Sequence, residues 1–171
     1  MKKKIALVVA SEGYQPTEYG VPKKLLEEAG FEVVTVSDIA GEVTASDNTT
    51  TQATVALKDF EASSVDGVFY IGGPGALTHL DNQETNRILN EAMIQGLVYG
   101  AICISPRILA KAHVLIGKKA TGWNEDGELE QIFAENNVEY ISEGVVVDGN
   151  SITADGPGSA QKFGEAIVSL F

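Results

Sequence analysis

Cys103 is the only cysteine of this 171-residue chain, and it stands between two contrasting segments. An apolar run typical of a strand covers 97–102, and a run with helical character covers 106–112. A nucleophile at such a tight strand-to-helix turn forms a nucleophile elbow, in which the residues two before and two after it must be small. Ala101 and Ser105 meet this requirement. We therefore predict a reactive thiol whose pKa is lowered by the N-terminus of the following helix; the alternative is a buried structural cysteine.

A glycine-rich turn, IGGPGA at 71–76, follows another predicted strand. It lacks the Gly-Lys-Ser/Thr ending of a phosphate-binding loop and the G-x-G-x-x-G spacing of a dinucleotide site. Glycines also serve simple tight turns, because they adopt backbone angles that other residues avoid. The chemical interpretation is that the Gly73 amide faces the elbow, with the amide of Ile104 or of Cys103 as a second donor. A developing oxyanion requires two such donors.

Glu18 lies at the start of a predicted helix after the first strand, and so near the carboxyl ends of the strands. An acidic residue there often does no more than complement the helix dipole. Beside Cys103 it has a second interpretation, because burial raises a carboxyl pKa and a protonated carboxyl donates a hydrogen bond to a thiolate. The two groups would then titrate as a coupled pair. Glu12 is the weaker competitor, since it precedes the turn into the helix.

Histidine is scarce, which restricts the mechanism. A Cys-His dyad needs an imidazole within hydrogen-bond reach of the thiol. His79 follows the glycine turn near the same rim, whereas His113 follows the elbow helix and is expected to point away. We place His79, Tyr14 and Trp123 among the candidate residues of the pocket. The alternatives are a satisfied polar role for the histidine and core packing for the aromatic residues.

The composition excludes several classes of protein. Twenty-four acidic and twelve basic residues give a formal net charge of −12, which repels phosphate backbones and argues against nucleic-acid binding. A single cysteine excludes an internal disulfide and a multi-cysteine metal site. No apolar run approaches the roughly 18 residues of a transmembrane helix, and no signal-peptide cleavage site follows the basic residues at 2–4. We expect a soluble, cytoplasmic protein with no metal site and no membrane partner.

The elements that position these groups follow from an alternation of short apolar runs and longer helical stretches. Such alternation predicts an α/β fold, with a mostly parallel sheet covered by helices on both faces. Ligands in such folds bind beyond the carboxyl ends of the strands, where the loop 10–19, the glycine turn and Cys103 converge. Length and composition fit one domain over 1–171.

We expect strands at 4–10, 31–37, 65–71, 97–103, 118–121 and on both sides of a turn at 147–151; helices at 16–30, 81–95, 106–112, 125–136 and 159–171; and a polar loop with a short edge hairpin at 38–54.

The chain resembles the ThiJ/PfpI superfamily in the segments GVFYIGGPGA, AICISPRILA and VVVDGNSITADGPGSAQKFGEAIVSLF. The resemblance covers almost the whole chain in order. It implies a flavodoxin-like three-layer α/β sandwich of the class I glutamine amidotransferase type, in a homodimer without a cofactor. By the same resemblance Cys103 matches the elbow cysteine of the family and Glu18 its pKa-modulating glutamate. Gly73 matches the glycine whose N–H faces the cysteine.

Departures from the family's patterns restrict the activity. Peptidases of the superfamily typically carry a histidine directly after the cysteine, where this chain has Ile104. The deglycase-like branch often has a histidine after the elbow helix, where this chain has Trp123. Isonitrile hydratases have an aspartate in place of Glu18, and amidotransferase relatives need a late His-x-Glu, whereas no histidine follows His113.

Three hypotheses remain. The first is a cofactor-free enzyme of the glyoxalase or deglycase type, in which Cys103 attacks a small reactive carbonyl, Glu18 moves protons, and the amides of Gly73 and Ile104 stabilise the oxygen. The second is a non-enzymatic redox-sensing stress protein, in which an oxidant modifies Cys103. The third, which Ile104 disfavours, is an intracellular cysteine peptidase.

Overall fold

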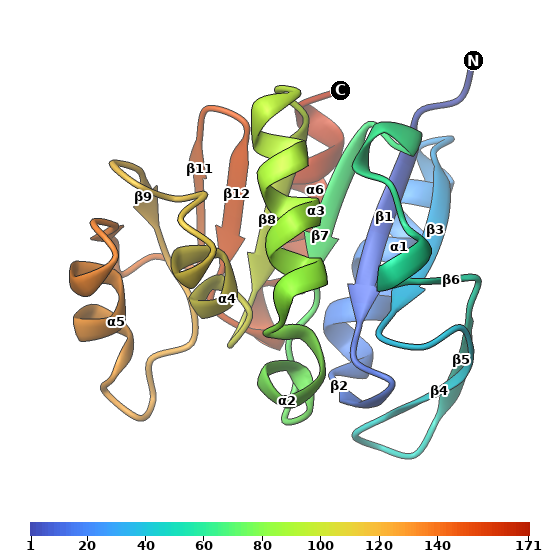
Figure 1. Ribbon diagram of the computed structural model, residues 1–171, viewed down its shortest axis with the longest axis horizontal. Coiled ribbons are helices and arrows are strands. Elements are labelled where there is room, and N and C mark those ends of the chain that lie inside the picture. The colour runs from blue at the N-terminus through green and yellow to red at the C-terminus, as the bar shows by residue number, and fades with distance from the viewer.

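A seven-stranded sheet runs through the centre of the computed structural model, which describes residues 1–171 (Figure 1). All neighbouring strands are parallel except the pair at one edge, β11 and β12. The predicted mostly parallel sheet is therefore confirmed. In spatial order the strands are β11 (Val145–Asp148), β12 (Ser151–Ala154), β8 (Val98–Ile102), β7 (Gly67–Tyr70), β1 (Lys4–Val9), β3 (Glu32–Ser37) and β6 (Val55–Ala56).

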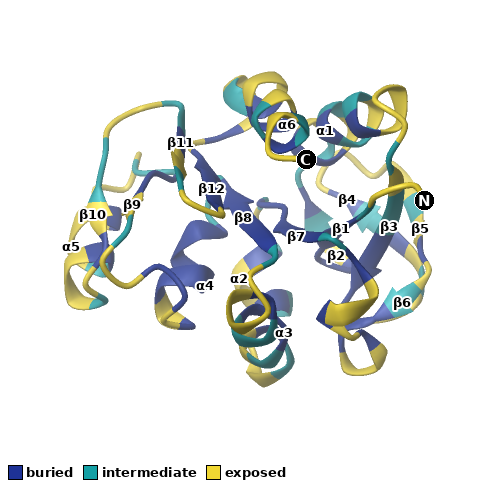
Figure 2. Ribbon diagram, turned by 90° about the horizontal axis from the view of Figure 1, so that it is seen from above, coloured by how far each residue is buried: buried dark blue, intermediate teal, exposed yellow.

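Helices cover both faces of this sheet (Figure 2). The helices α1 (Pro16–Glu28) and α6 (Ala160–Ser169) lie on one face, and α3 (Gln83–Ile94) and α4 (Pro106–Lys111) lie on the other. The sheet is apolar on both sides, as a doubly covered parallel sheet must be; in β1 the residues 5–9 are completely buried. No helix combines the length and the apolar character that crossing a membrane requires.

Helix α1 is held in place at its start and along its length. Its N-cap residue is Gln15, whose side chain accepts a hydrogen bond of 2.8 Å from the amide of Glu18. Along its length it packs against Gly164 of α6, where a Cβ would approach the Leu25 side chain to 2.7 Å. The missing side chain lets α1 and α6 pack closely against each other.

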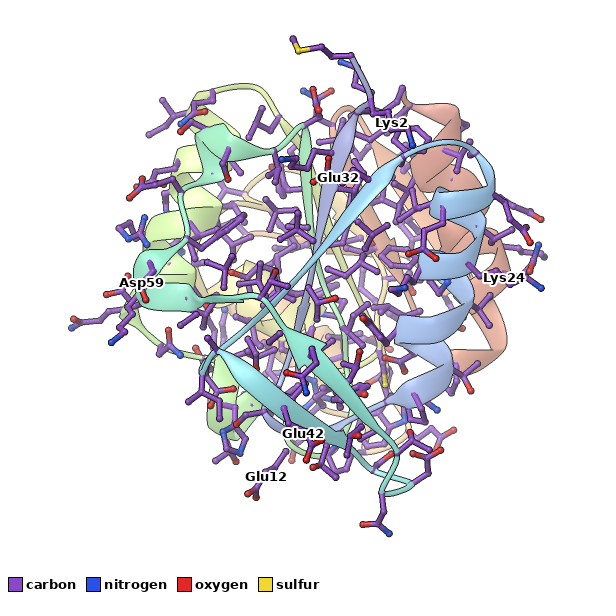
Figure 3. All side chains as sticks on the ribbon, turned by 90° about the vertical axis from the view of Figure 1, so that its right-hand side faces the viewer. Lys2, Glu12, Lys24, Glu32, Glu42 and Asp59 are labelled. Atoms are coloured by element: carbon purple, nitrogen blue, oxygen red, sulfur yellow. The ribbon has the colours of Figure 1, made fainter.

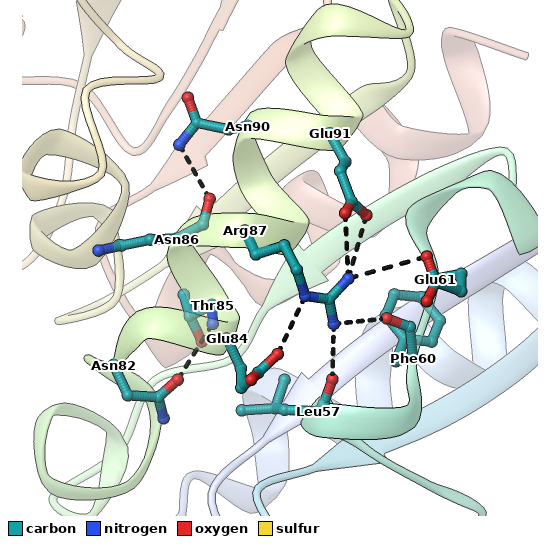
Figure 4. A network of polar contacts seen from close by, with 10 residues as sticks. All are labelled: Leu57, Phe60, Glu61, Asn82, Glu84, Thr85, Asn86, Arg87, Asn90 and Glu91. Atoms are coloured by element: carbon teal, nitrogen blue, oxygen red, sulfur yellow. Dashed lines mark hydrogen bonds and ion pairs between the residues drawn. The ribbon is translucent and has the colours of Figure 1, made fainter.

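A network around Arg87 joins α3 to the chain that enters β7 (Figure 4). Its guanidinium pairs with Glu84 and Glu91 on the same helix, at 3.0 and 3.1 Å. It also donates hydrogen bonds of 3.1 and 2.9 Å to the carbonyl oxygens of Leu57 and Phe60. Arg87 therefore fixes the 3-10 helix η1 (Leu57–Asp59), and the segment after it, against α3.

Two small sheets accompany the main one and correct part of the prediction for 38–54. The expected hairpin forms, as β4 (Gly41–Ala45) and β5 (Thr50–Ala53), but it does not pair with the edge of the main sheet. It pairs instead with β2 (Glu12–Tyr14), a strand that the sequence pattern did not indicate. Glu12 and Glu42 accordingly lie at the same end of the molecule (Figure 3).

The remaining elements lie at the other end of the main sheet and around the strand ends. Helix α5 begins at Leu129, later than the predicted 125, because the side-chain oxygens of Asn124 and Asp126 accept hydrogen bonds from the amides of Leu129 and Glu128 and close a turn at 124–128. The short helix α2 after the glycine turn was not predicted. These elements are α2 (Ala76–Leu80), α5 (Leu129–Glu135), β9 (Lys119–Ala120), β10 (Glu139–Tyr140), η2 (Ala62–Ser64) and η3 (Pro157–Ser159).

The close approach of β8 and β12 gives a test of the fold. Replacing Gly100 by Ala would drive its Cβ into the backbone carbonyl oxygen of Ile152. We expect this variant to lose at least about 2 kcal/mol of unfolding free energy, because backbone cannot move aside cheaply. The matched control is Gly20→Ala on α1, where no atom lies within 4 Å of the new Cβ; we expect a gain of up to about 1 kcal/mol. Equal urea midpoints for the two variants would contradict the strand packing.

Candidate active site

Cys103 occupies a nucleophile elbow. It directly follows the last residue of β8 and adopts φ 65°, a left-handed conformation that is uncommon for a residue with a side chain. Helix α4 starts three residues later at Pro106, as predicted. The flanking Ala101 and Ser105 are both fully buried, which explains why only small residues fit there. This strained backbone conformation directs the thiol out of the sheet, at the carboxyl ends of the strands.

Hydrogen bonds hold the elbow to its neighbours. The Cys103 amide donates to the carbonyl oxygen of Ala154 at 2.9 Å, and its own carbonyl oxygen accepts from the Trp123 amide at 2.7 Å. The Ser105 hydroxyl donates to the Ile71 carbonyl oxygen at 2.8 Å, inside the core. Ser105 therefore has two roles. It is small enough for the elbow, and its hydroxyl ties the elbow to the end of the strand that leads into the glycine turn.

Glu18 reaches the elbow from α1 and is completely buried beside Cys103. Its Oε2 accepts a hydrogen bond of 2.9 Å from the Gly72 amide. Its other oxygen, Oε1, has no hydrogen-bond partner among the nitrogen and oxygen atoms of the protein. A Cβ at Gly72 would lie 2.7 Å from both the Cys103 Cβ and Glu18 Oε2. Only glycine at this position lets the carboxyl and the thiol meet.

Burial sets the proton affinity of both groups. It raises the pKa of Glu18 from 4.5 to about 7, although hydrogen bonding from Cys103 and Gly72 acts in the opposite direction. Burial also raises the pKa of the Cys103 thiol, and the adjacent Glu18 carboxylate adds to this effect. The amides of Ile104 and Gly73 act to lower the pKa of Cys103 but do not outweigh the other causes.

The prediction that a helix N-terminus lowers the Cys103 pKa is therefore wrong for the free protein. Helix α4 has only six residues, and desolvation together with a like charge exceeds its influence. The Glu18 carboxylate, in contact with the thiol, is the group placed to accept its proton during a reaction. Such a transfer creates a thiolate without changing the net charge of the buried Glu18–Cys103 pair, so its desolvation cost is smaller than that of ionising Cys103 alone.

The backbone amides of Gly73 and Ile104 face the Cys103 sulfur, so the two predicted donors lie at the elbow. Gly73 has φ 118°, and a Cβ there would meet the backbone of Gly13 and Gln15. A side chain at 73 is thus excluded twice, by conformation and by space. The turn after β7 is held in the one shape that points its amide at the sulfur.

A cavity of about 820 Å³ opens above these groups. Cys103, Glu18, Gly73 and Ile104 line it, together with Trp123 among the three predicted pocket residues. The rest of its wall was not predicted, because it comes from loops that only the fold brings together. These residues are Gln15, Pro74, Leu77, Glu125, Asp155, Gly156, Pro157, Gly158 and Ser159.

Tyr14 and His79, which were expected at the pocket, do not line it. Tyr14 is buried with its ring edge-on to Tyr19, at a centroid distance of 5.5 Å. His79 lies 3.0 Å through Nδ1 from Asp38, which also accepts a hydrogen bond of 2.7 Å from the Ser11 hydroxyl. Tyr14 therefore packs in the core and His79 has a hydrogen-bonded polar role, which are the structural alternatives to a place in the pocket.

Arg107 fixes the loop that carries Trp123 over the cavity. It is nearly buried on α4 and pairs with Asp126 at 2.7 Å, while donating to the Trp123 carbonyl oxygen at 3.2 Å. Its guanidinium lies 5.5 Å from the centre of the Trp123 ring, within the range of a cation–π contact. Sequence reasoning missed this role, because Arg107 looks like an ordinary helical residue until the loop at 121–128 folds back on it.

The fold and the site define a class: α/β proteins of flavodoxin-like architecture with a cysteine on a nucleophile elbow, paired with a buried glutamate. The DJ-1/PfpI family model matches residues 3–170, and the chain belongs to that family. The resemblance to ThiJ/PfpI proteins inferred from sequence is thereby confirmed.

Three relatives illustrate the range of the family. An uncharacterized protein of Methanocaldococcus jannaschii is 31% identical over 96% of this chain and 80% of its own length. A deglycase of Thermococcus kodakarensis is 26% identical, over 96% of this chain and 97% of the relative. A putative cysteine protease of Bacillus subtilis is 28% identical over 99% of both chains.

Solved structures agree with the fold. The crystal structure of a ThiJ/PfpI domain protein from Brachyspira murdochii superimposes with a TM-score of 0.93, at 27% identity and over 99% of this chain and 97% of the other. The flavodoxin-like arrangement is therefore common to this chain and its relatives.

Replacing Glu18 by Gln should remove a pH dependence of stability. Because the Glu18 pKa rises from 4.5 to about 7 on folding, the native protein binds this proton more tightly than the unfolded chain does. The unfolding free energy of the wild type should therefore fall, relative to that of the variant, as the pH rises between these values, by on the order of 3 kcal/mol. Urea unfolding on either side of this interval measures the change. A constant difference between the two proteins would contradict the raised pKa.

The single tryptophan makes the Arg107 clamp observable. Arg107→Lys keeps the charge but loses the planar fork that holds Asp126 and the Trp123 carbonyl oxygen. We expect the emission of Trp123 to shift to longer wavelength and its quenching by acrylamide to increase, since the loop becomes more mobile. Lys111→Arg, an exposed exchange on the same helix, serves as the control. Unchanged emission in Arg107→Lys would show that the loop does not depend on this clamp.

Proposed function

We propose that this protein is a cofactor-free, cysteine-dependent enzyme that converts small reactive carbonyl compounds, in the manner of a glyoxalase or deglycase. The observation that carries the proposal is the buried Glu18–Cys103 pair, with the amides of Gly73 and Ile104 at the sulfur. A nucleophile, a proton-transfer group and two amide donors in one cavity are the parts that addition to a carbonyl requires.

The first step is addition of Cys103 to the aldehyde carbon. The thiol proton passes to Glu18, a C–S bond forms, and the carbonyl π electrons move to oxygen. The amides of Gly73 and Ile104 stabilise the developing negative charge, and Glu18 returns the proton to that oxygen. The product is a hemithioacetal, and the site has regained its original net charge. A Glu18 pKa of about 7 suits both proton transfers near neutral pH.

With methylglyoxal the reaction continues by a proton shift. Glu18 removes the proton from the former aldehyde carbon and the electron pair moves to the neighbouring carbonyl oxygen, giving an enediolate. That oxygen takes the proton of the hemithioacetal hydroxyl, and Glu18 returns its proton to the adjacent carbon. The product is a lactoyl thioester on Cys103. Attack by water cleaves its C–S bond, releases lactate and restores the thiol. The sum is methylglyoxal plus water giving lactate and a proton, with no external oxidant or reductant. Hydrolysis of an early glycation adduct would begin with the same addition of Cys103.

Named relatives support this reaction class at the level of the family. A deglycase of Thermococcus kodakarensis and a glutathione-independent glyoxalase of Caenorhabditis elegans are 26% and 25% identical to this chain. The peptidase alternative has less support, although one relative is named a putative cysteine protease. Residue 104 is Ile, no histidine lines the cavity, and His79 is engaged with Asp38. A peptidase needs a base that also protonates the leaving amine.

Redox sensing is the second candidate, because Cys103 is only partly buried and sits beside the amides of Gly73 and Ile104. These amides would stabilise the oxygen atoms of an oxidised sulfur. Mass spectrometry after mild peroxide treatment separates this candidate from a structural cysteine. A sensor should show oxygen added to Cys103 before either of the two methionines; the reverse order would exclude it.

The enzyme proposal is tested by following the loss of methylglyoxal and the formation of lactate. We expect Cys103→Ala to reduce turnover to background and Glu18→Gln to lower kcat at least about 100-fold, the contribution typical of general acid–base catalysis. The matched control is Glu12→Gln, which changes an exposed acid pointing away from the molecule and outside the cavity wall (Figure 3). Equal rates for wild type, Cys103→Ala and Glu18→Gln would refute the proposal.

A further inference from the structure

We propose that the cavity selects its substrates by charge: it admits neutral and cationic carbonyl compounds and rejects anionic ones. The inference rests on the proposed function, because only an enzyme of that kind would use these compounds as substrates. The charge selection itself concerns any reagent that reaches Cys103. The residues that would impose it are Glu125 and Asp155 at the rim, with Glu18 at the base.

All charged side chains of the cavity wall are carboxylates. Glu18, Glu125 and Asp155 line it, whereas no lysine, arginine or histidine does. Neither Glu125 nor Asp155 takes part in an ion pair. A neighbouring hollow of about 270 Å³ shares Trp123, Glu125 and Asp155 and adds Glu143. The negative potential therefore extends from the elbow to the outer surface.

Arg107, the cation packed against Trp123, does not offset this potential. It is buried, with Asp126 at 2.7 Å and Glu128 at 3.6 Å from its nitrogen atoms. Two carboxylates thus more than neutralise its charge. The same contacts hold the loop that carries Trp123 and Glu125, so Arg107 positions the negative rim without weakening it.

The base of the cavity adds a third carboxyl group. Glu18 Oε1 is buried without a nitrogen or oxygen partner, and the carboxyl is in hydrogen-bond contact with the Cys103 thiol. A ligand carboxylate or phosphate brought to Cys103 would add a like charge beside this carboxyl, whereas a neutral or ammonium group would not. At the rim, the Ser159 hydroxyl donates to Asp155 at 2.6 Å and fixes the orientation of that carboxylate.

The favoured substrate class therefore consists of neutral oxoaldehydes and carbonyl adducts that carry hydroxyl or ammonium groups. Keto acids and phosphorylated carbonyl compounds would meet repulsion from Glu125 and Asp155 at the rim and from the Glu18 carboxyl at the base. A cavity lined by one sign of charge acts on the rate of encounter as well as on binding, so the effect should weaken with salt.

The test uses three methanethiosulfonate reagents that differ only in the head group: 2-aminoethyl, 2-hydroxyethyl and 2-sulfonatoethyl. In each case the Cys103 thiolate attacks the sulfenyl sulfur, a disulfide forms and methanesulfinate leaves. Because Cys103 is the only cysteine, mass spectrometry counts its modification directly. We expect, after normalisation to a free small thiol, that the cationic reagent reacts about fivefold faster than the neutral one, and the anionic reagent about fivefold slower, at low salt.

The double variant Glu125→Gln/Asp155→Asn should bring the three normalised rates together, and added salt should do so in the wild type. Both changes are at exposed positions, and Asn at 155 still accepts from Ser159. The control is Glu130→Gln, an exposed acid on α5 outside the cavity, which should keep the wild-type order. Equal normalised rates in the wild type, or a faster anionic reagent, would overturn the inference.

A final comparison separates the two proposals. Turnover of methylglyoxal is compared with that of 4,5-dioxopentanoate, which has the same 2-oxoaldehyde group but carries a carboxylate. Charge-ordered modification of Cys103 without any turnover would refute the proposed function and leave the charge selection supported. Equal turnover of both aldehydes would refute the selection and leave the proposed function supported.

Discussion

The contact between the Glu18 carboxyl and the Cys103 thiol is the constraint on which the rest of the site depends. A carboxyl that is completely buried is costly unless its surroundings compensate it, and here they do so only in part, through the Gly72 amide and the thiol. Bringing the two groups together requires a glycine at 72 and a left-handed backbone at 103. Each of these two positions restricts which residue or backbone conformation the chain can have there, and both positions lie at the carboxyl ends of the strands.

The distribution of charge follows from the same constraint. The two arginines of the chain are both structural: Arg87 joins α3 to the segment before β7, and Arg107 holds the loop over the cavity. Their charges are neutralised by carboxylates of the protein. The charged groups of the cavity wall are all acidic, so no cation there stabilises a Cys103 thiolate. This arrangement explains why both pKa values are raised.

The sequence pattern predicted most of the fold because buried parallel strands and covering helices are the local signals that a chain of this class displays most clearly. The sequence pattern predicted less well where a strand pairs with a segment distant in sequence. The hairpin β4–β5 was expected at the sheet edge and instead pairs with β2, and α5 starts only after a turn closed by Asn124 and Asp126. Tyr14 and His79 were expected at the pocket because their positions near the strand ends were known, whereas the directions of their side chains were not.

The sequence by itself determined the elbow, the glycine turn and the acidic residue after the first strand, because these depend on residue types at fixed short spacings. Only the tertiary structure decided that Glu18 is buried against Cys103, that Ser105 ties the elbow to Ile71, and that Arg107 supports Trp123. It also decided that burial raises the thiol pKa where local reasoning predicted a decrease. The physical reason is that desolvation and the proximity of a second charge depend on elements distant in sequence, whereas a helix N-terminus can be recognised from a few neighbouring residues.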